Sequence, residues 1–422
     1  MIHQLISIAV FLIVIVSIMT EKVHRSVAAV AGAVVLLLTQ VLSVETSVSY
    51  IDFNTIGVLI GMMLFVAVVR QSGVFEYIAI RSAKLAKGDP WRIMVLFVLI
   101  TAVLSAFLDN VTTVLLIGPM TIAITRMLEV DPVPFLVTQI LASNIGGTAT
   151  LIGDPPNIMI GSAAGLSFVD FITNTGLAVV IILAVTLLCF RFLYYRSLVV
   201  TERAKLAVLE LDEKKTIRDA ALMKKSIAMI ALVALGFVLH STLHLDSSAI
   251  ALAGASVMLL IGRQDADQII ADVEWSTIVF FTGLFVVVGG MVESGVINKL
   301  AQILMSVTDG HMIITMMVLL WASALLSSVL DNIPFVATLI PLILTMQADG
   351  IDVTPFWWAI SLGACLGGNG TLIGASANVV LSGIGNKHGY PISFSGYLKV
   401  GFPLMILSVI ISTIFLLIRY AL

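Results

Sequence analysis

The sequence contains little charge and almost no cysteine. Only 11% of its 422 residues are Asp, Glu, Lys or Arg, about half the fraction typical of a soluble globular protein. The net charge is −3, so no basic excess exists to neutralise phosphates, and we expect no nucleic-acid partner. Two cysteines, Cys189 and Cys365, cannot build a disulfide framework or a structural zinc site.

What the sequence has instead is apolar residues, which make up 59% of the chain and give a mean hydropathy of +1.12. Such a chain needs lipid as its solvent, so we predict a polytopic membrane protein. We expect the first span to be retained rather than cleaved as a signal peptide, because no Lys or Arg precedes it. The predicted spans lie near 4–20, 26–42, 53–70, 174–196, 226–243, 248–262, 275–292 and 400–419.

Two longer apolar regions, 91–171 and 311–398, are interrupted by polar and Gly/Pro clusters. We expect each to hold one re-entrant hairpin and one broken spanning helix, and the short segments 74–87 and 296–307 to be interfacial helices. With the N-terminus outside, this arrangement places 20 of the 22 Lys and Arg on the cytoplasmic side. The positive-inside rule therefore predicts that both termini lie outside the cell membrane and that 197–224 is a cytoplasmic linker.

The chain also resembles itself at an offset near 222 residues. Leu108-Asp109-Asn110-Val111 aligns with Leu330-Asp331-Asn332-Ile333, and further matches occur along both halves. We predict an all-α fold with a first repeat over 1–196, the linker 197–224 and a second repeat over 225–422. Each repeat has about five spanning helices, one of them broken, and one re-entrant hairpin. Because five crossings is an odd number, the second repeat is inverted, which is typical of secondary transporters.

Polar residues at the two predicted hairpin tips form the first candidate site. A carboxylate at membrane depth is costly unless it meets water, an ion or a partner. We interpret the two aspartates as proton or cation carriers, the asparagines as hydrogen-bonding partners and the serines as further oxygen ligands. Helix capping is the compatible structural alternative. The candidates are Ser105, Asp109, Asn110, Thr112 and Thr113 in the first half, and Ser327, Asp331 and Asn332 in the second.

The second candidate site lies where glycine and proline clusters unwind a helix in each half. Freed backbone groups and half-helix ends at membrane depth bind ions, whereas the alternative is close helix packing through small residues. No strand precedes these glycines, so they are not a nucleotide-binding loop. The candidates are Asn144, Gly146, Gly147, Thr148, Asp154 and Asn157, with Gly367, Gly368, Asn369, Thr371, Ser376 and Asn378 in the second half.

These motifs resemble the ion transporter superfamily over essentially the whole chain. The stretches SAFLDNVTTVLL, NIGGTATLIGDPPN, LDNIPFVATLIP and GACLGGNGTLIGASANVV are similar to the citrate-transporter-like branch that holds arsenite permeases, NhaD-type sodium–proton antiporters and the melanosomal P protein. The resemblance implies a dimerising scaffold made of the first three helices of each half. It also implies a mobile transport region with the hairpins, broken helices and final helices, moving by an elevator-type alternating access. Dicarboxylate-carrying relatives have Ser-Asn-Thr at the hairpin tips, where this chain has Asp109-Asn110-Val111 and Asp331-Asn332-Ile333.

The sequence thus favours a secondary active transporter that couples protons to a small inorganic solute. The candidates are Na+/H+ antiport and efflux of arsenite or antimonite as a neutral hydroxyacid, since two fixed anions would repel a dicarboxylate. We expect no enzyme activity, no cofactor and no resident metal, although sodium could bind transiently at Asp109 and Asp331. An anion or dicarboxylate symporter and a passive ion channel remain alternatives. The expected partners are protons, the solute, membrane lipid and a second copy of the chain, with a separate ATPase subunit left open.

Overall fold

The computed structural model describes residues 2–20 and 22–421, and the secondary structure in these ranges is helical. Eight helices are long and apolar enough to cross a membrane, or nine if one bent pair counts as a single span. The protein is a multi-pass integral membrane protein. The first half contains α1 (Ile2–Thr20), α2 (Arg25–Leu38), α3 (Val44–Ser49), α4 (Phe53–Arg70), α5 (Val74–Leu85), α6 (Pro90–Phe107), α7 (Asn110–Met127), α8 (Val133–Gly147), α9 (Pro155–Ala164), α10 (Phe168–Phe171) and α11 (Leu177–Tyr194).

The second half repeats this order of elements. A short connecting helix, α12, precedes it, and a bend of 119° separates α17 from α18. The connecting helix is α12 (Glu202–Leu209). The second half contains α13 (Ala220–Leu239), α14 (Ser247–Gly262), α15 (Ala266–Ala271), α16 (Trp275–Glu293), α17 (Val296–Val307), α18 (Met312–Ser327), α19 (Asn332–Ala348), α20 (Thr354–Gly367), α21 (Ser376–Lys387) and α22 (Phe394–Tyr420).

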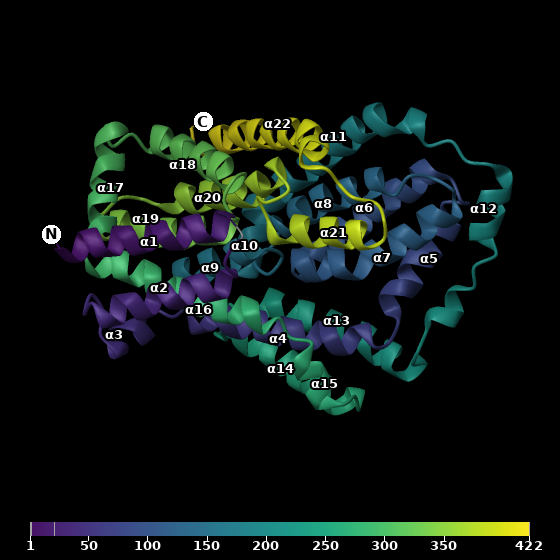
Figure 1. The fold of residues 1–422 in the computed structure, drawn as a ribbon, viewed down its shortest axis with the longest axis horizontal. Helices are drawn as coiled ribbons and strands as arrows, with labels where there is room; N and C mark the ends of the chain where they lie inside the picture. Colours follow the sequence, from purple (N-terminus) through teal and green to yellow (C-terminus); the bar gives the residue numbers. More distant parts are fainter. Residues whose placement is uncertain (1, 21, 422) are drawn as a thin grey trace.

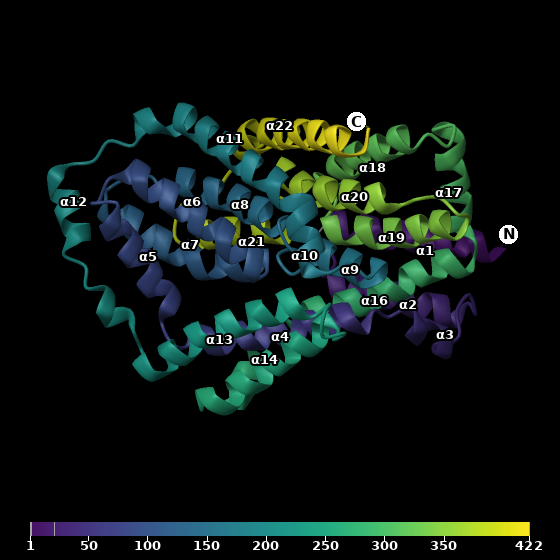
Figure 2. The same ribbon diagram turned by 180° about the vertical axis from the view of Figure 1, so that it is seen from behind.

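The two halves run in opposite directions through the molecule. The hairpin α6–α7 enters from the end where α12 lies, and the hairpin α18–α19 enters from the other end, where α3 and α17 lie (Figures 1 and 2). The start of α1 and the end of α22 both lie at the end away from α12. The inverted repeat with one hairpin and one broken helix per half, predicted from the sequence, is therefore confirmed.

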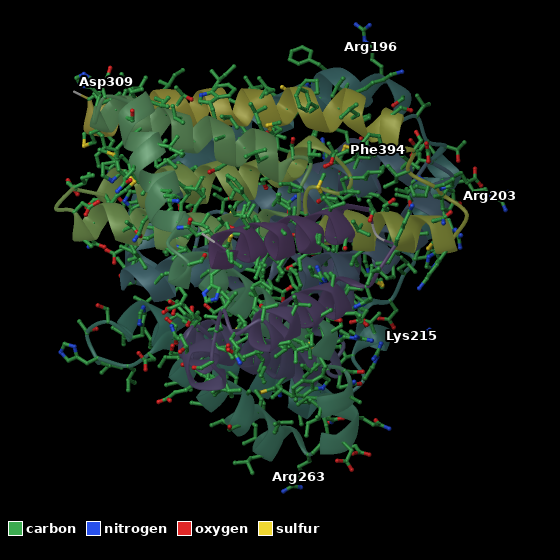
Figure 3. The ribbon with its side chains drawn as sticks, turned by 60° about the vertical axis from the view of Figure 1, so that its left-hand side comes forward. Arg196, Arg203, Lys215, Arg263, Asp309 and Phe394 are labelled. Carbon is green, nitrogen blue, oxygen red and sulfur yellow. The ribbon has the colours of Figure 1, made fainter. Side chains whose placement is uncertain are left out.

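Basic side chains gather at the α12 end of the molecule. Arg196, Arg203 and Lys215 lie there, whereas Asp309 lies at the opposite end (Figure 3). The segment predicted as a linker forms α12 and a 3-10 turn over Glu213–Thr216. The following helix begins at Ala220, not near residue 225, because the side chain of Asp219 caps it by accepting hydrogen bonds from the backbone N–H groups of Ala221 and Leu222.

Helices α2–α4 and α13–α16 form one layer, and α1 packs on α2 and α16 of this layer (Figure 1). We call α1–α4 with α13–α16 the scaffold, and α6–α11 with α18–α22 the transport region. Within the scaffold, the third helix of each half packs on the second helix of the other half. A Cβ atom on Gly61 of α4 would lie 2.6 Å from the Ala251 backbone of α14, and one on Gly283 of α16 would lie 2.8 Å from the Ala29 backbone of α2. These contacts are mirror equivalents, so small residues let both helix pairs approach closely.

Candidate functional site

At both hairpin tips an aspartate caps the second helix of the hairpin. Asp109 precedes α7 and accepts a hydrogen bond of 2.8 Å from the backbone N–H of Thr112, and also one from the hydroxyl of Thr112. Asp331 precedes α19 and accepts a hydrogen bond of 3.3 Å from the backbone N–H of Ile333. Both aspartates therefore satisfy the first orphan N–H groups of a half-helix, as the sequence predicted. Capping uses only part of the four acceptor positions of each carboxylate, so both can still bind a ligand.

The two tips converge on a third carboxylate, that of Asp154. Asn110, beside the first tip aspartate, donates a hydrogen bond of 3.1 Å to Asp154 Oδ1. Asn332, at the equivalent position of the second tip, donates to both Asp154 oxygens at 3.4–3.5 Å. Asp154 is fully buried in the break between α8 and α9. The pairing of the two tip aspartates stays a prediction, whereas the two tip asparagines meet at Asp154.

An asparagine network joins the two broken helices behind Asp154. The side chain of Asn144 on α8 donates hydrogen bonds of 2.9 Å to Asn369 and to Asn378 in the second half. The amide group of Asn378 donates to the carbonyl oxygens of Gly368 and Thr371 at 2.7 and 2.8 Å. Because buried carbonyl groups need hydrogen-bond donors, this network stabilises the unwound segments rather than leaving them free for a ligand.

Asn157 is the mirror equivalent of Asn378 and holds its own broken helix in the same way. Its amide donates to the carbonyls of Gly147, Thr148 and Thr150 at 2.9–3.3 Å. Its oxygen accepts a hydrogen bond of 2.7 Å from Ser361. The hydroxyl of Thr148 also turns back to the carbonyl of Asn144 at 2.7 Å. These side chains therefore hold the broken helix that carries Asp154 in its unwound shape.

Several side chains predicted as ligands donate hydrogen bonds to backbone carbonyls. The hydroxyl of Ser105 donates to the carbonyl of Ser143, and that of Ser327 donates to the carbonyl of Ala364, both at 2.7 Å. Thr371 donates to the carbonyl of Ser328 at 2.5 Å. These bonds tie each hairpin to the broken helix of its own half. The side chain of Thr113 is fully buried, and its hydroxyl has no hydrogen-bond partner among the residues that the structure describes.

The glycine pairs bring the hairpins and broken helices into close contact. A Cβ atom on Gly367 would lie 2.5 Å from the carbonyl oxygen of Ala324 on α18, and Gly146 makes the mirror contact with Ala102 on α6. A Cβ atom on Gly147 would lie 2.5 Å from the carbonyl oxygen of Gly153 across the turn. The close-packing alternative thus accounts for these glycines, while the polar groups around them form the network described above.

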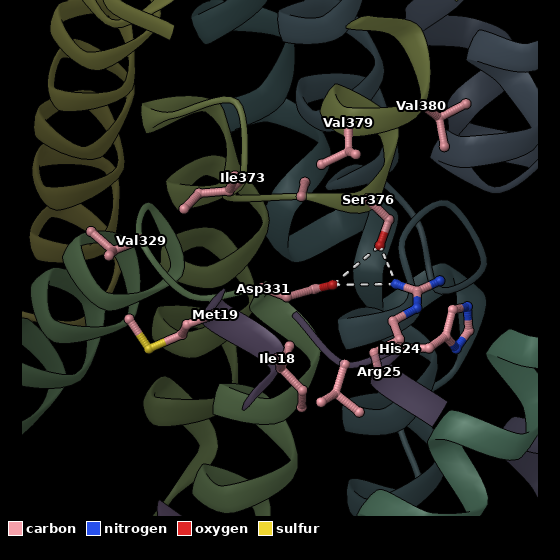
Figure 4. Close-up of a pocket in the computed structure, with 12 residues that line it drawn as sticks. Ile18, Met19, His24, Arg25, Val329, Asp331, Ile373, Ser376, Val379 and Val380 are labelled. Atoms are coloured by element: carbon pink, nitrogen blue, oxygen red, sulfur yellow. Dashed lines mark hydrogen bonds and ion pairs between the residues drawn. The ribbon is translucent and has the colours of Figure 1, made fainter. Parts of the chain in front are cut away.

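Two adjoining cavities lie between the transport region and the scaffold. The smaller one has a volume of about 20 Å³, enough for roughly one water molecule. Among the candidates from the sequence it is lined by Asp109, Asn110, Asp154, Asn332 and Ser376. The larger one has a volume of about 280 Å³ and is lined by Asp331 and Ser376 beside apolar residues from α1 and α21 (Figure 4).

The scaffold wall of the cavities contributes charged residues that the sequence analysis did not single out. Arg25, the first residue of α2, lines both cavities, and Glu274 and Thr277 at the start of α16 line the smaller one. Arg25 points at Asp331 and Ser376 (Figure 4). No polar cluster marks Arg25 or Glu274 in the sequence. Each stands at the start of a scaffold helix, which the sequence pattern alone does not connect with the site.

The electrostatic balance of the two cavities is acidic. The titratable residues that line them are Asp109, Asp154, Glu274, Asp331, Arg25 and His24. In their ordinary ionisation states, four carboxylates thus surround one guanidinium among the described residues. Uncompensated carboxylates at this depth favour uptake of protons or cations. The described residues contain no cluster of three or more His, Cys, Asp and Glu side chains arranged to hold a metal ion.

Comparison with known proteins supports the assignment to membrane transport. The citrate transporter family matches residues 15–363. An uncharacterized transporter of Mycobacterium tuberculosis is 41% identical, with 99% of both chains covered. The 46 kDa membrane protein of Mycobacterium leprae is 39% identical, with the same coverage. The human P protein is 34% identical over 95% of this chain and 58% of its own length. The chain also superposes on the crystal structure of the Alcanivorax borkumensis YdaH transporter, which is described as having an unusual topology. The TM-score is 0.56 at 15% identity, and the superposition covers 89% of this chain and 88% of the other.

Proposed function

This chain belongs to the citrate transporter family of membrane transporters, and we propose that it is a secondary active transporter that couples proton movement to a small inorganic solute. The candidate processes are Na+/H+ antiport and efflux of arsenite or antimonite. The observation that supports this proposal is the acidic cavity between the hairpin tips. Its volume of about 20 Å³ suits a water, a proton carrier or one small cation, and is too small for citrate.

Charge supports the same conclusion. Asp109, Asp154, Glu274 and Asp331 outnumber the cationic Arg25 along the two cavities. A di- or tricarboxylate would be repelled by roughly 1–4 kcal/mol for each like-charge pair near 4 Å in wet surroundings. Protons, sodium or an uncharged hydroxyacid avoid this cost. We propose Asp109, Asp154 and Asp331 as the groups that carry the coupling ion, with Asn110 and Asn332 positioning Asp154.

The proposed transport step is an elevator-type movement of the transport region along the scaffold. Its support is the composition of the cavity walls. Leu59, Met63, Glu274 and Thr277 come from the scaffold, whereas the three site aspartates come from the hairpins and the broken helix. A site at the boundary of two packed layers changes its exposure when one layer slides along the other.

A carboxylate symporter is the second candidate, and one observation favours it. The larger cavity of about 280 Å³ carries the guanidinium of Arg25 and the hydroxyl of Ser376, and guanidinium groups bind carboxylates well. The description of the family as citrate transporters is consistent with this alternative.

Transport by purified protein in proteoliposomes, with an imposed pH gradient, tests these candidates against one another. Sodium, arsenite and citrate are supplied in turn. We expect saturable, proton-dependent flux of sodium or arsenite, driven uphill by the gradient, and this flux should be lost in the double variant D109N/D331N. The matched control is D246N/D309N, which removes two exposed acids outside the cavities. Proton-coupled citrate flux would favour the symporter, and flux that never saturates would favour a channel. Undiminished coupling in D109N/D331N would refute the assigned carriers.

A further inference from the structure

Arg25 is the residue through which the scaffold contacts the charged part of the transport region. Its guanidinium donates hydrogen bonds to Ser376 Oγ at 2.7 Å and to Asp331 Oδ2 at 3.4 Å (Figure 4). The same group donates to Thr277 Oγ1 on α16 at 2.9 Å and lies over the Phe280 ring, 5.3 Å from its centroid. Arg25 is thus anchored to the scaffold by two residues while it holds the transport region by two others.

The Arg25–Asp331 pair is unlike the other salt bridges of the described residues. Those join α5 and the segment between α11 and α13, or lie within α12, whereas only this pair connects the scaffold to the transport region. It is also well shielded, with 25% of the Arg25 side chain and 12% of the Asp331 side chain exposed. A shielded pair is screened little by salt, and separating it leaves both charges without a partner.

The position of Arg25 is not one that helix stability would select. A cation in the first turn of a helix is opposed by the helix dipole. Asp331, by contrast, also accepts a hydrogen bond of 3.1 Å from Ser376, so three polar groups form a closed triangle. The other charged or titratable groups around this triangle are His24, which lines the same cavity, Glu274, which accepts a hydrogen bond of 3.0 Å from Thr277, and Asp109 and Asp154 of the smaller cavity. The strength with which Arg25 is held therefore depends on how many of these acids are ionised.

We propose that Arg25 is a charge lock that keeps the unloaded transport region from moving. When Asp331 is ionised and empty, its pairing with Arg25 holds the transport region against the scaffold in the arrangement that the structure shows. When a proton or a cation neutralises Asp331, the pairing weakens and the loaded region is released. This proposal rests on the proposed function, and it explains how such a carrier would avoid crossing the membrane empty, which is the condition for tight coupling.

The lock is tested by measuring the movement directly, without any transported solute. Spin labels are attached to D267C on α15 of the scaffold and K387C on α21 of the transport region, both exposed positions, in the C189A/C365A background. We expect one distance at alkaline pH for the otherwise wild-type protein and a second distance at acidic pH. In R25Q the second distance should already appear at alkaline pH, with its population raised about tenfold, as the loss of a charge-assisted hydrogen bond predicts. D331N should behave like R25Q.

Two further variants keep the proposal falsifiable. R25K retains the charge without the planar fork and should lie between the wild type and R25Q, which also covers the case that R25Q fails to fold. K22Q removes a neighbouring exposed cation and should match the wild type. The lock is overturned if R25Q and D331N show the wild-type distances at every pH. The proposed function fails separately, if wild-type vesicles show no proton-coupled flux of any tested solute while the distances respond as described.

Discussion

Asn110 and Asn332, which occupy equivalent positions in the inverted halves, both donate hydrogen bonds to the one carboxylate of Asp154. A single buried acid thus receives one amide from each membrane-inserted hairpin. Asp154 itself has no acidic counterpart in the second half, where the aligned position is Ala375. The symmetry of the scaffold and hairpins is therefore broken at the place where the two halves meet.

This convergence predicts matched effects of two distant substitutions. Asn110→Ala and Asn332→Ala should each lower the apparent melting temperature in detergent by several degrees, since each leaves the buried carboxylate one donor short. Losing a hydrogen bond to a charged group costs about 1.5–3 kcal/mol. Asn386→Ala, at an exposed position near the end of α21, should have little effect. A loss confined to one of the two variants would show that Asp154 does not depend on both tips.

The crossed helix pairs of the scaffold predict a second pair of matched effects. Gly61→Ala and Gly283→Ala each place a methyl group within 3 Å of a neighbouring helix backbone. Overpacking of this kind costs about 1–3 kcal/mol, so both variants should unfold at lower temperature. The control is Gly383→Ala, where an added Cβ meets nothing within 4 Å and helix propensity should slightly favour alanine. Equal stability of all three variants in thermal denaturation would contradict the close packing.

The serines of the hairpins offer a test that separates packing from ligand binding. Ser105→Ala and Ser327→Ala each remove a buried hydroxyl that bonds to a backbone carbonyl. We expect each to cost about 1 kcal/mol of stability, while the solute concentration for half-maximal flux stays at its wild-type value. Flux measured over a range of solute concentrations decides the matter. A large rise in the half-saturating concentration, with stability unchanged, would show that these serines bind the solute.

The segment between α11 and α13 predicts a dependence on pH at the α12 end. Glu213 accepts hydrogen bonds from Lys84 at 2.6 Å and from Arg81 at 3.0 Å, both on α5. The hydrogen bond from Lys84, with further help from Arg81, lowers the pKa of Glu213 from 4.5 to about 2. Because the folded-state pKa lies below the unfolded value, the attachment is complete above about pH 4.5 and is lost as the pH falls toward 2.

Limited proteolysis of the region around residues 198–218 measures this attachment. Cleavage of this region by an acid-active protease should accelerate as the pH falls from about 4.5 toward 2. Glu213→Gln should show rapid cleavage already at neutral pH, because a neutral amide cannot replace the two charge-assisted bonds. Glu210→Gln, a nearby acid without such partners, is the control. Cleavage of Glu213→Gln at the wild-type rate would show that these ion pairs do not hold the segment.

The sequence by itself determined the order of the long, broken and hairpin helices and the opposite direction of the two halves. Their apolar lengths, the glycine and proline breaks, and the Asp-Asn tips near 109 and 331 are local features, and the 222-residue offset repeats them. Local features suffice here because a membrane allows only helices with internally satisfied backbones, so the pattern of apolar and broken segments leaves few alternatives.

Only the tertiary structure decided which side chains share a cavity. Arg25 contacts Asp331, which lies 306 residues later in the sequence, and Glu274 lines the adjoining cavity with Arg25. These contacts form because α2 and α16 pack side by side, which the sequence pattern does not encode. The same packing turns Ser105 and Ser327 toward backbone carbonyls and brings the asparagines of both tips to Asp154. Hydrophobic burial is non-directional, so the identity of long-range neighbours follows from the shapes of the packed helices and not from their periodicity.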